Sequence, residues 1–412
     1  MVGRGTAGSL AAASVTRLHP DSDHELHHIY DSRIPVIGVG EGSWPSLVQE
    51  LHKLTDLPHE TVQQRLKGTR KYGVAFEGGW GRRNRDFTHY FTPQQVSYAY
   101  HLSADLMGEL LHESTRAQHV DANVLNISRA DGGAQVEFED RPPEYYDLVF
   151  DARGFPRELN ADEHIDVSFI PTNTAVIRRC PTVIEVPHDG PVVQHTYTRA
   201  VARPHGWVFV IPLTAHTSYG YIFNRDVTDL AEVESDFGAF LEADGVSEFE
   251  QRAVLRFPNF VHRRIFDGAI ARVGNAAAFM EPLEATAIVS AQLQIGMVLQ
   301  IRLNRPLEHL ERDRPGVSRF VIKNILCYGL FVGWHYACGS KYDSEFWRHA
   351  RDHAWPRHRT AADPEVVDCD ALGKFDDMMN LVNQSVIDKA DWDRMCAVPL
   401  TSYAQLSQGL GC

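Results

Sequence analysis

The chain has 412 residues, of which 43% are hydrophobic and 23% are charged. This composition is typical of a globular protein with one large or two medium domains. The formal net charge of −14 argues against nucleic acid as the main partner, because phosphate binding needs a basic face. The six cysteines are scattered without a C-x-x-C pair, and no signal peptide is evident. We therefore expect a cytoplasmic protein with reduced thiols.

Three glycines near the start of the chain, Gly3, Gly5 and Gly8, fit the spacing G-x-G-x-x-G. Such a loop lets a backbone approach a pyrophosphate, and the small residues after it predict a helix whose N-terminus faces the phosphate. The segment 24–31 predicts a short strand that ends at an acid, Asp31, near the spacing expected of a ribose-hydroxyl partner. Only two residues precede the loop, so the strand that should lead into it is short.

Helices and strands alternate through the rest of the first half. The leucine spacing predicts a helix over 46–57, and a longer helix is predicted over 96–115. The apolar stripe of the longer helix is formed by Ala99, Leu102, Leu106 and Leu110. A β-hairpin is expected to turn at 131–133, and the mostly apolar run 145–155 predicts a buried parallel strand.

The second half begins with strands and ends with helices. Four strand-like segments between 168 and 225 predict an antiparallel sheet, and helices are expected over 229–243 and from about 287 to 350. The longest apolar run, 325–334, is too short to span a bilayer and is expected to be a buried helix. The histidines show no metal-ligand spacing along the sequence, so no metal is predicted.

This order of elements predicts an α/β fold in which a dinucleotide-binding domain is interrupted by a sheet. We expect the dinucleotide domain over 1–165 and 255–300, the antiparallel sheet over 166–254, and a helical C-terminal region over 301–412. A second cradle for an anion is predicted in "VGNAAAFMEPLEATAI", where Gly274 and Asn275 follow a strand and small residues open a helix.

Four motifs in order carry a resemblance to a known family. They are "GRGTAGSLAAA", "GVGEGSWP", "GWVFVIP" and "EPLEATA", and a weaker likeness continues to residue 348. The chain resembles the flavin-dependent halogenases of the tryptophan-halogenase family. The resemblance implies a Rossmann-like FAD-binding domain of the monooxygenase and halogenase type. The residues it assigns to FAD are Gly3, Gly5, Thr6, Ala7, Gly8, Asp31, Gly40, Glu41, Gly274 and Asn275.

The resemblance also implies a reaction. FAD reduced by a separate flavin reductase would react with oxygen and oxidise chloride or bromide to hypohalous acid. A lysine would then deliver the halogen to an electron-rich aromatic ring of the indole, phenol or pyrrole type. The segment "GTRKYGVAFEGGW" identifies this lysine as Lys71, and Glu284 matches the functional glutamate. The backbone N–H groups of Thr286 and Ala287 match the halide site.

Each of these residues also has a structural interpretation. Most lysines lie on the surface, but the apolar residues around Lys71 predict a strand with buried alternate positions. A desolvated lysine has a lowered pKa, which suits it to hydrogen-bond the oxidant or be halogenated by it. Glu284 would otherwise be a carboxylate that caps a helix, a role for which Glu281 is the better candidate. Trp207 and Phe209 match the aromatic pair that keeps substrate from the flavin, although aromatic strand residues are usually core.

The chain departs from the family pattern in three ways. Phe209 replaces the second tryptophan, and Ala285 and Ala287 replace a serine and a glycine. The change at Ala287 is tolerable unless that residue needs a positive φ. Most important, "FTHYFTP" leads directly to the next predicted helix, without the insertion that closes over the indole in tryptophan-specific members. The segment "FDDMMNLVNQ" has little of their C-terminal aromatic cluster.

We therefore expect an open site that takes a bulkier or carrier-tethered aromatic substrate. The expected partners are this substrate and the flavin reductase, with no nucleic acid and no membrane, and a homodimer is left open. Two alternatives remain at this stage: a flavin monooxygenase that hydroxylates an aromatic, and a non-catalytic flavin-binding relative.

Overall fold

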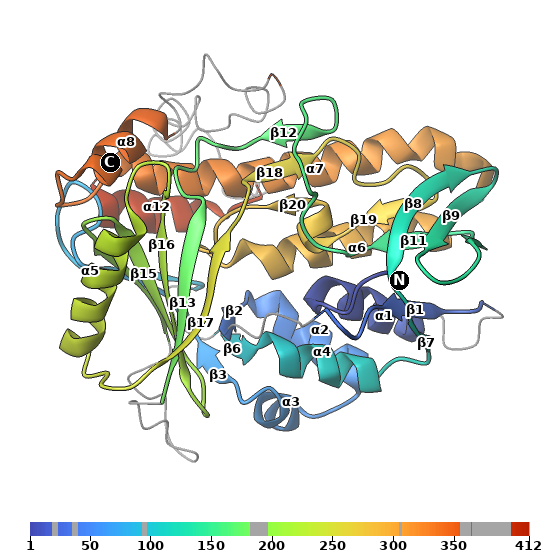
Figure 1. Ribbon diagram of the computed structural model, residues 1–412, viewed down its shortest axis with the longest axis horizontal. Coiled ribbons are helices and arrows are strands. Elements are labelled where there is room, and N and C mark those ends of the chain that lie inside the picture. Colours follow the sequence, from blue (N-terminus) through green and yellow to red (C-terminus); the bar gives the residue numbers. More distant parts are fainter. Residues whose placement is uncertain are drawn as a thin grey trace.

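The computed structural model describes residues 1–18, 24–34, 40–92, 97–181, 197–304, 307–354, 364 and 397–411. A large upright sheet lies at left in Figure 1, and a smaller layer of helices and strands lies at lower right. Two long helices, α6 (Thr286–Asn304) and α7 (Leu307–Cys338), run across the view above this layer. This is the predicted α/β class.

The N-terminal layer is a parallel sheet with the glycine loop at its centre. In spatial order its strands are β7 (Gln118–Asp121), β1 (His27–Tyr30), the single residue Val2, β11 (Val149–Asp151) and β19 (Ile270–Arg272). Val2 pairs with both neighbouring strands: its own N–H donates to Phe150 O on the β11 side, and the N–H of the next residue, Gly3, donates to Ile29 O of β1. The helix α1 (Thr6–Leu18) follows the loop. The predicted helix after the glycines and the two predicted strands are confirmed.

One predicted helix is wrong over its first half. Residues of the expected apolar stripe, Ala99 and Leu102, lie in a strand, and the helix α4 spans only Ala104–Glu113. The strand, β6 (Ala99–Ser103), is the centre of a small sheet and is buried along its whole length. Because a fully buried strand is apolar on both faces, its residues also match a helical spacing by chance.

The remaining elements of this half surround the nucleotide-binding layer. The sheet around β6 also contains β2 (Gly40–Gly42) and β3 (Thr69–Lys71), and helices α2 (Pro45–Thr55) and α3 (His59–Arg65) lie next to it. The predicted hairpin is formed by β8 (Val124–Ala130) and β9 (Gly133–Phe138), which pairs with β10 (Glu144–Tyr146). A further sheet contains β12 (His164–Asp166), β18 (Phe260–His262) and β20 (Ala278–Phe279).

The large sheet has seven strands. Their spatial order is β17 (Glu250–Arg256), β13 (Thr174–Cys180), β16 (Thr217–Phe223), β15 (Gly206–Pro212), β14 (Tyr197–Arg203), β4 (Gly73–Glu77) and β5 (Phe87–Tyr90). The predicted antiparallel pairing of the segments between 168 and 225 is confirmed. The sheet is nevertheless mixed, because β14 pairs in parallel with β4. Two of its strands thus come from residues 73–90, far from the rest in sequence.

The two faces of this sheet contact different parts of the protein. Val208 and Val210 of β15 pack with the predicted helix α5 (Leu230–Ala243) in one hydrophobic cluster. The alternate residues Trp207 and Phe209 belong to the main core on the opposite face. This alternation follows from the period of two in a strand.

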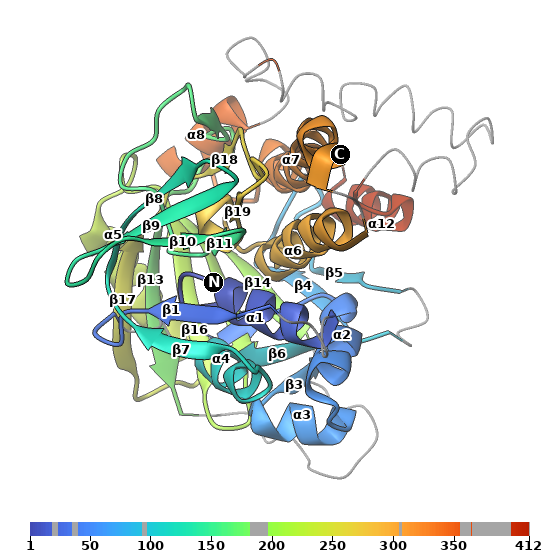
Figure 2. The ribbon, with the colours of Figure 1, turned by 90° about the vertical axis from the view of Figure 1, so that its right-hand side faces the viewer.

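The C-terminal part is helical, as predicted. Its described helices are α6 (Thr286–Asn304), α7 (Leu307–Cys338), α8 (Glu345–His353) and α12 (Leu400–Leu410). Figure 2 shows α6 between α1 and α7. Among the described residues, Pro315–Cys338 of α7 is long and apolar enough to cross a membrane, but 72% of the stretch is buried inside the protein. The run 325–334 is therefore a core helix, as expected.

Candidate active site

The glycine loop closes tightly against the parallel sheet and leaves room at the helix N-terminus. Gly3 has φ +108°, and a Cβ there would lie 2.4 Å from Ala152 O. A Cβ on Gly8 would lie 2.0 Å from Gly3 O, so both positions exclude side chains. At Gly5, by contrast, a Cβ would meet no described atom within 4 Å. The first turn of α1 contains no acid, so the open side of Gly5 suits an anionic group.

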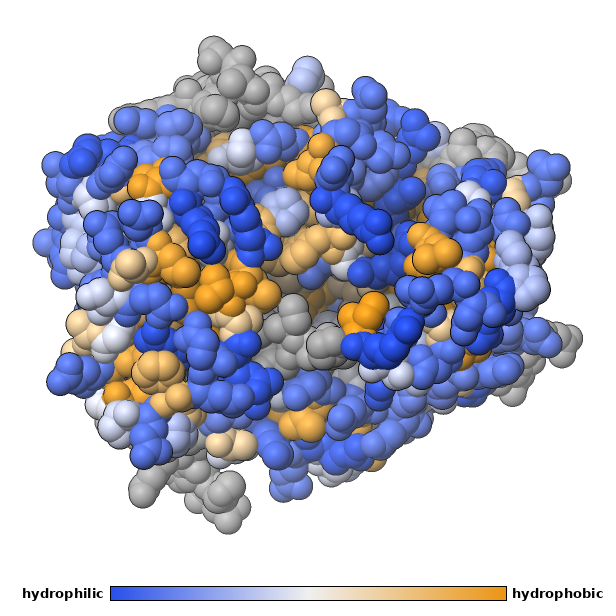
Figure 3. All heavy atoms as spheres, in the orientation of Figure 1, coloured by the Kyte–Doolittle hydropathy of each residue, from blue (hydrophilic) through white to orange (hydrophobic). Residues whose placement is uncertain are grey.

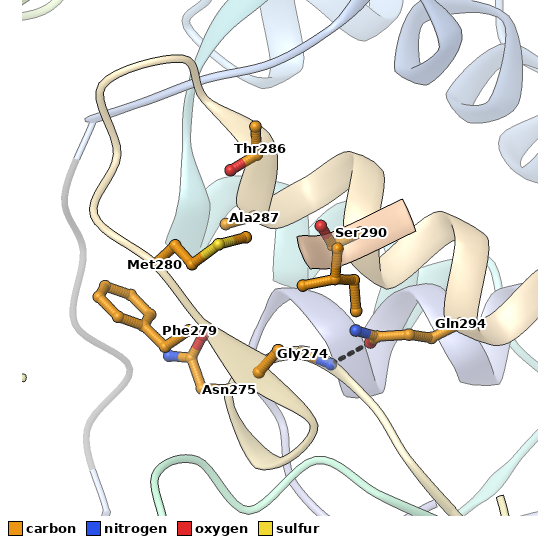
Figure 4. A pocket seen from close by; sticks show the side chains of 10 residues that line it. Gly274, Asn275, Phe279, Met280, Thr286, Ala287, Ser290 and Gln294 are labelled. Carbon is orange, nitrogen blue, oxygen red and sulfur yellow. Dashed lines mark hydrogen bonds between the residues drawn. The ribbon is translucent and has the colours of Figure 1, made fainter. Parts of the chain in front are cut away.

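The second predicted cradle lies beside this loop. A Cβ on Gly274, which has φ +58°, would lie 2.5 Å from Ala7 Cβ, so the two glycine motifs meet. Figure 4 shows a cavity between this segment and α6, with Gly274 N–H donating to Gln294 Oε1 at 2.7 Å. Its volume is about 10 Å³, and it also contains Asn275 and Ser290. Gly274 does not open a helix as expected, because a 3₁₀ turn and β20 follow it and α6 begins at Thr286.

Two polar groups in this cavity have no hydrogen-bond partner among the described residues. They are Ser290 Oγ and Gln294 Nε2, and both are buried. An unsatisfied buried polar atom costs about 1–3 kcal/mol, so these groups suit a ligand that bonds them. Together with the open N-terminus of α1, they fit a dinucleotide such as FAD.

Two predicted cofactor contacts lie on neighbouring strands. Asp31 follows β1 and accepts hydrogen bonds from Arg33, which lower the pKa of its carboxyl. Gly40 and Glu41 lie in β2, and burial together with Asp105 raises the pKa of Glu41 to about 7. Their contact with a flavin stays a prediction. The first two residues of the motif "GVGEGSWP" lie outside the described residues.

The two glycines provide a matched pair of variants. We expect Gly3→Ala to destabilise the protein by about 1–3 kcal/mol, because its φ is positive and the new Cβ meets Ala152 O. Gly5→Ala should leave the melting temperature unchanged and weaken flavin binding, because its Cβ fills the open side of the helix N-terminus. Thermal unfolding and FAD titration of both variants would test this. Equal loss of stability in both would contradict it.

A buried carboxylate, Glu284, is held between two histidines. Its Oε2 lies 3.1 Å from Nδ1 of His89 on β5, and its Oε1 lies 3.0 Å from Nε2 of His335 on α7. Nδ1 of His335 lies 2.8 Å from Phe331 O, so both ring nitrogens of His335 face hydrogen-bond acceptors. Burial alone would raise the pKa of Glu284, but the charges and hydrogen bonds of His89 and His335 lower it to about 2. Glu284 is therefore ionised at neutral pH.

Lys71 lies at the end of β3 and is fully buried. Its Nζ donates to Ser43 O at 3.4 Å and lies 5.3 Å from the centre of the Phe91 ring. Burial lowers the pKa of Lys71 to about 8, although nearby Glu284 raises it in part. A Cβ on Gly42 would touch both Nζ, at 3.0 Å, and Ala285 Cβ, at 3.5 Å. The predicted strand with buried positions is confirmed, and the interpretation as a surface lysine is wrong.

Glu281 belongs to a separate buried network. Its Oε2 accepts hydrogen bonds from Thr172 Oγ1 at 2.5 Å, Tyr336 OH at 2.6 Å and Trp207 Nε1 at 3.4 Å. Burial raises the pKa of Glu281 to about 7 against these bonds. Neither Glu281 nor Glu284 lies in a helix, since α6 begins later, so the capping role expected for Glu281 is wrong. The interpretation of Trp207 and Phe209 as core residues is confirmed, and their separation of substrate from flavin stays a prediction.

The predicted halide residues form the first turn of α6. Thr286 and Ala287 line the cavity of Figure 4, next to Gly274 and Asn275. Ala285 has φ +54°, but Ala287 is not among the residues with positive φ. The condition for tolerating alanine at 287 is therefore met. The first N–H groups of a helix have no partner within it, so they can hold an anion.

A wider groove lies beyond the ring of Phe279. It has a volume of about 620 Å³ and includes Phe155, Phe257 and Thr172. The Phe279 ring packs against Phe155 and Phe257 with centroids 4.9 and 5.1 Å apart, so it lies between the groove and the cavity. Figure 3 shows that the face in view is hollowed near its centre, with hydrophobic side chains around the hollow.

Sequence reasoning missed the groups that hold Glu284. His89 and His335 bond the side-chain carboxylate of Glu284, and Trp44 bonds its backbone, since Trp44 Nε1 donates to Glu284 O at 2.8 Å. His335 could have been identified from the sequence, because it directly follows the longest apolar run and a buried histidine needs a hydrogen-bond partner.

Comparisons with known proteins identify the family. The family model for tryptophan halogenase matches residues 1–96 and 92–363. Tryptophan 7-halogenase RebH of Lentzea aerocolonigenes is 22% identical over 84% of this chain and 77% of its own length. The match to tryptophan 6-halogenase SttH of Streptomyces toxytricini is 24% identical and covers 64% of this chain, but the chain spans only about half, 50%, of that relative.

Solved structures share the fold. The flavin-dependent halogenase Xcc4156 from Xanthomonas campestris superposes with a TM-score of 0.75 at 24% identity, over 87% of this chain and 82% of its own. MibH, a lanthipeptide tryptophan 5-halogenase, superposes with a TM-score of 0.77 at 22% identity, over 100% of this chain and 85% of its own. The family model covers most of the sequence, and three of the four motifs meet in the structure, through the bonds of Trp44 to Glu284 O and of Trp207 to Glu281. The chain therefore belongs to the tryptophan halogenase family of flavin-dependent halogenases.

Proposed function

We propose that this protein halogenates an electron-rich aromatic substrate with reduced FAD, oxygen and chloride or bromide. The observation that carries the proposal is the buried pair of Lys71 and ionised Glu284. A hydroxylase of the same fold has no need for a desolvated lysine at this place. The relatives named as tryptophan halogenases support the same reaction class.

Groups of this chain suit the binding of both the cofactor and the halide. Reduced FAD, when bound, would supply the electrons with which oxygen converts halide to hypohalous acid. The N-terminus of α1 would hold its pyrophosphate, and the unpartnered groups of Ser290 and Gln294 would bond its polar chain. The N–H groups of Thr286 and Ala287 would hold the halide at the positive end of α6.

Lys71 would act as a hydrogen-bond donor. With a pKa of about 8, it is mostly an ammonium at pH 7. The ammonium would donate to the oxygen of hypohalous acid and direct the halogen toward the ring. As the carbon–halogen bond forms, the halogen–oxygen bond breaks and the oxygen leaves as water after taking the lysine proton. The buried site strengthens this hydrogen bond because little water competes for it.

Glu284 would stabilise the cation that forms on the ring. A carboxylate with a pKa of about 2 stays negative while the ring is positive. It can then accept the proton that leaves the halogenated carbon. His335 keeps the carboxylate in place.

Product analysis tests this proposal. The protein would be incubated with a flavin reductase, FAD, oxygen and bromide, and a panel of indoles, phenols and pyrroles would be analysed by mass spectrometry. We expect a monobrominated product that requires bromide. A hydroxylated product that forms equally well without halide would instead support a monooxygenase. Absence of oxygen consumption with reduced FAD would support a non-catalytic relative.

Free tryptophan should be a poor substrate. The segment between Tyr90 and Ala99 is too short for the insertion of tryptophan-specific members, and each lost aromatic contact costs about 0.5–1.5 kcal/mol beyond its buried area. The segment 375–384, which is predicted to lack the C-terminal aromatic cluster, lies outside the described residues. One C-terminal ring is in place, since Tyr403 of α12 packs 4.9 Å from Phe331.

Steady-state kinetics would measure this preference. We expect kcat/KM for L-tryptophan to be at least about tenfold below that for a larger indole or a peptide-borne tryptophan, because one or two missing ring contacts suffice for that ratio. The name of MibH, which acts on a lanthipeptide, fits a peptide substrate. A clear preference for L-tryptophan at micromolar KM would contradict an open site.

A further inference from the structure

We propose that His28, His112 and His119 form a binding site for a zinc(II) ion beside the glycine loop. They come from β1, from the last turn of α4 and from β7, and one nitrogen of each lies within 4.8 Å of the others. Three imidazoles with a fourth position open to water are a known zinc coordination. None of the three belongs to the groups that we assign to flavin or catalysis.

The proton on His28 is placed by its neighbour. Nε2 of His28 lies 2.9 Å from Gly3 O. A carbonyl oxygen only accepts, so Nε2 carries the proton and Nδ1 keeps its lone pair. Nδ1 is buried and has no hydrogen-bond partner among the described residues. Histidines that bind metals are usually oriented by such a bond from the other ring nitrogen, so His28 is already arranged as a ligand.

The other two histidines complete the set. Nδ1 of His112 is also buried without a described partner, and its ring centroid lies 3.6 Å from that of His119. His119 is exposed, so an ion can enter from solvent. Zinc–nitrogen bonds of about 2.0–2.1 Å place tetrahedral ligands about 3.4 Å apart, so the nitrogens need to approach by at most about 1.4 Å. The exposed ring of His119 can make this turn.

The charges around the cluster allow a cation. Burial lowers the pKa of all three histidines, and that of His28 falls to about 4. Arg4 is the nearby side-chain cation, with its guanidinium 5.0 Å from the centre of the Tyr30 ring, and Glu113 offsets it beside His112. The Met1 amino group lies near His28 but is itself desolvated, and burial lowers its pKa to about 5.

A second cluster, Glu163 with His164 and His262, is less suited to a metal. Nδ1 of His262 accepts the N–H of Arg264 at 3.0 Å, so its proton lies on Nε2 and no lone pair is left for an ion. The charges of Arg264 and Arg272 also act on this cluster. The first cluster is not visible in the sequence because His28 is far along the chain from His112 and His119, and the β1–β7 register places His28 opposite His119.

Zinc titration of the untagged full-length chain tests the proposal. After dialysis against a chelator, the protein would be titrated with zinc chloride by calorimetry, and bound metal would be counted after gel filtration. We expect one zinc per chain and a melting temperature that rises with zinc. His119→Ala should weaken binding at least tenfold, because even the loss of an outer partner costs about 10–100-fold in metal affinity. His205→Ala, on the turn between β14 and β15, is the matched control.

His119→Ala removes an exposed side chain, so this variant should fold normally, and its melting temperature without zinc would verify normal folding. Unchanged zinc affinity in His119→Ala would overturn the proposal and point to another pair, such as the stacked His349 and His353. Absence of zinc binding by the wild type in the titration would also overturn it. A visible cobalt spectrum typical of four-coordinate cobalt(II), lost in His119→Ala, would support it.

Discussion

Replacing Lys71 by methionine should reduce halogenation by about 10²–10⁴-fold while flavin binding stays intact. Methionine has a similar volume and no charge, so the buried space around Gly42 and Phe91 remains filled. What is lost is the only group that we expect to direct the halogen toward the substrate. Product formation would be measured by mass spectrometry with catalase present, alongside FAD titration. Lys53→Met, an exposed lysine on α2, is the control.

The pH dependence gives a second test of the same residue. If the ammonium of Lys71 is the working form, activity should fall as the pH rises through about 8, where this ammonium loses its proton. Lys71→Arg stays charged over that range, so any residual activity should lack the fall. An increase in wild-type activity above pH 8 would mean that the free amine is halogenated instead. Near-normal halogenation by Lys71→Met would show that the lysine has no part in delivery.

Replacing Glu284 by glutamine should lower turnover by about 10–10³-fold. The amide keeps the shape and leaves no negative charge to stabilise the ring cation or accept its proton. The variant should also unfold at a lower temperature, because it removes the carboxylate that bonds both His89 and His335. Activity per folded molecule, measured well below the melting temperature, separates the two effects. Unchanged activity per folded molecule would assign Glu284 a structural role only.

Glu281→Gln is the matched control, since Glu281 is equally buried and lies outside the histidine pair. Acid unfolding gives an independent check on Glu284. Its folded pKa is about 2, below the ordinary value of 4.5, so it contributes stability above pH 4.5 that is lost as the pH falls toward 2. The wild type should lose this contribution in that window, and Glu284→Gln should lack it.

The elements that follow local rules could be predicted from the sequence. The helix after the glycine loop, the hairpin at 131–133 and the core helix over 325–334 all have spacing or turn residues that specify them. The strand β6 could not be predicted, because a strand buried on both faces has no alternation of polar and apolar residues. The 3₁₀ turn and β20 that stand in place of the helix expected after Gly274 could not be predicted either, since the turn depends on the contact of Gly274 with Ala7 of α1.

The candidate site also has parts that could be predicted from the sequence and parts that could not. Lys71 and Glu284 lie in motifs, so their positions could be predicted. Their environment could not, because His89 and His335 are 195 and 51 residues from Glu284 and meet it only through the fold. The burial of Lys71 was expected from its neighbours, but the contact of its ammonium with Ser43 O depends on the pairing of β3 with β6.

The parallel pairing of β14 with β4 also determines how this enzyme could be recombined with its relatives. A chimera that exchanged only residues 166–254 would replace β14 while keeping the native β4 and β5, and five backbone pairings from Tyr197 to Val201 would have to re-form against a foreign strand. Additional crossover points before Thr69 and after Tyr90 would instead transfer β3, β4 and β5, and with them Lys71 and His89, together with the strands of residues 166–254. In this fold, the strands that pair in one sheet come from two separate stretches of sequence, so both stretches would have to be exchanged together.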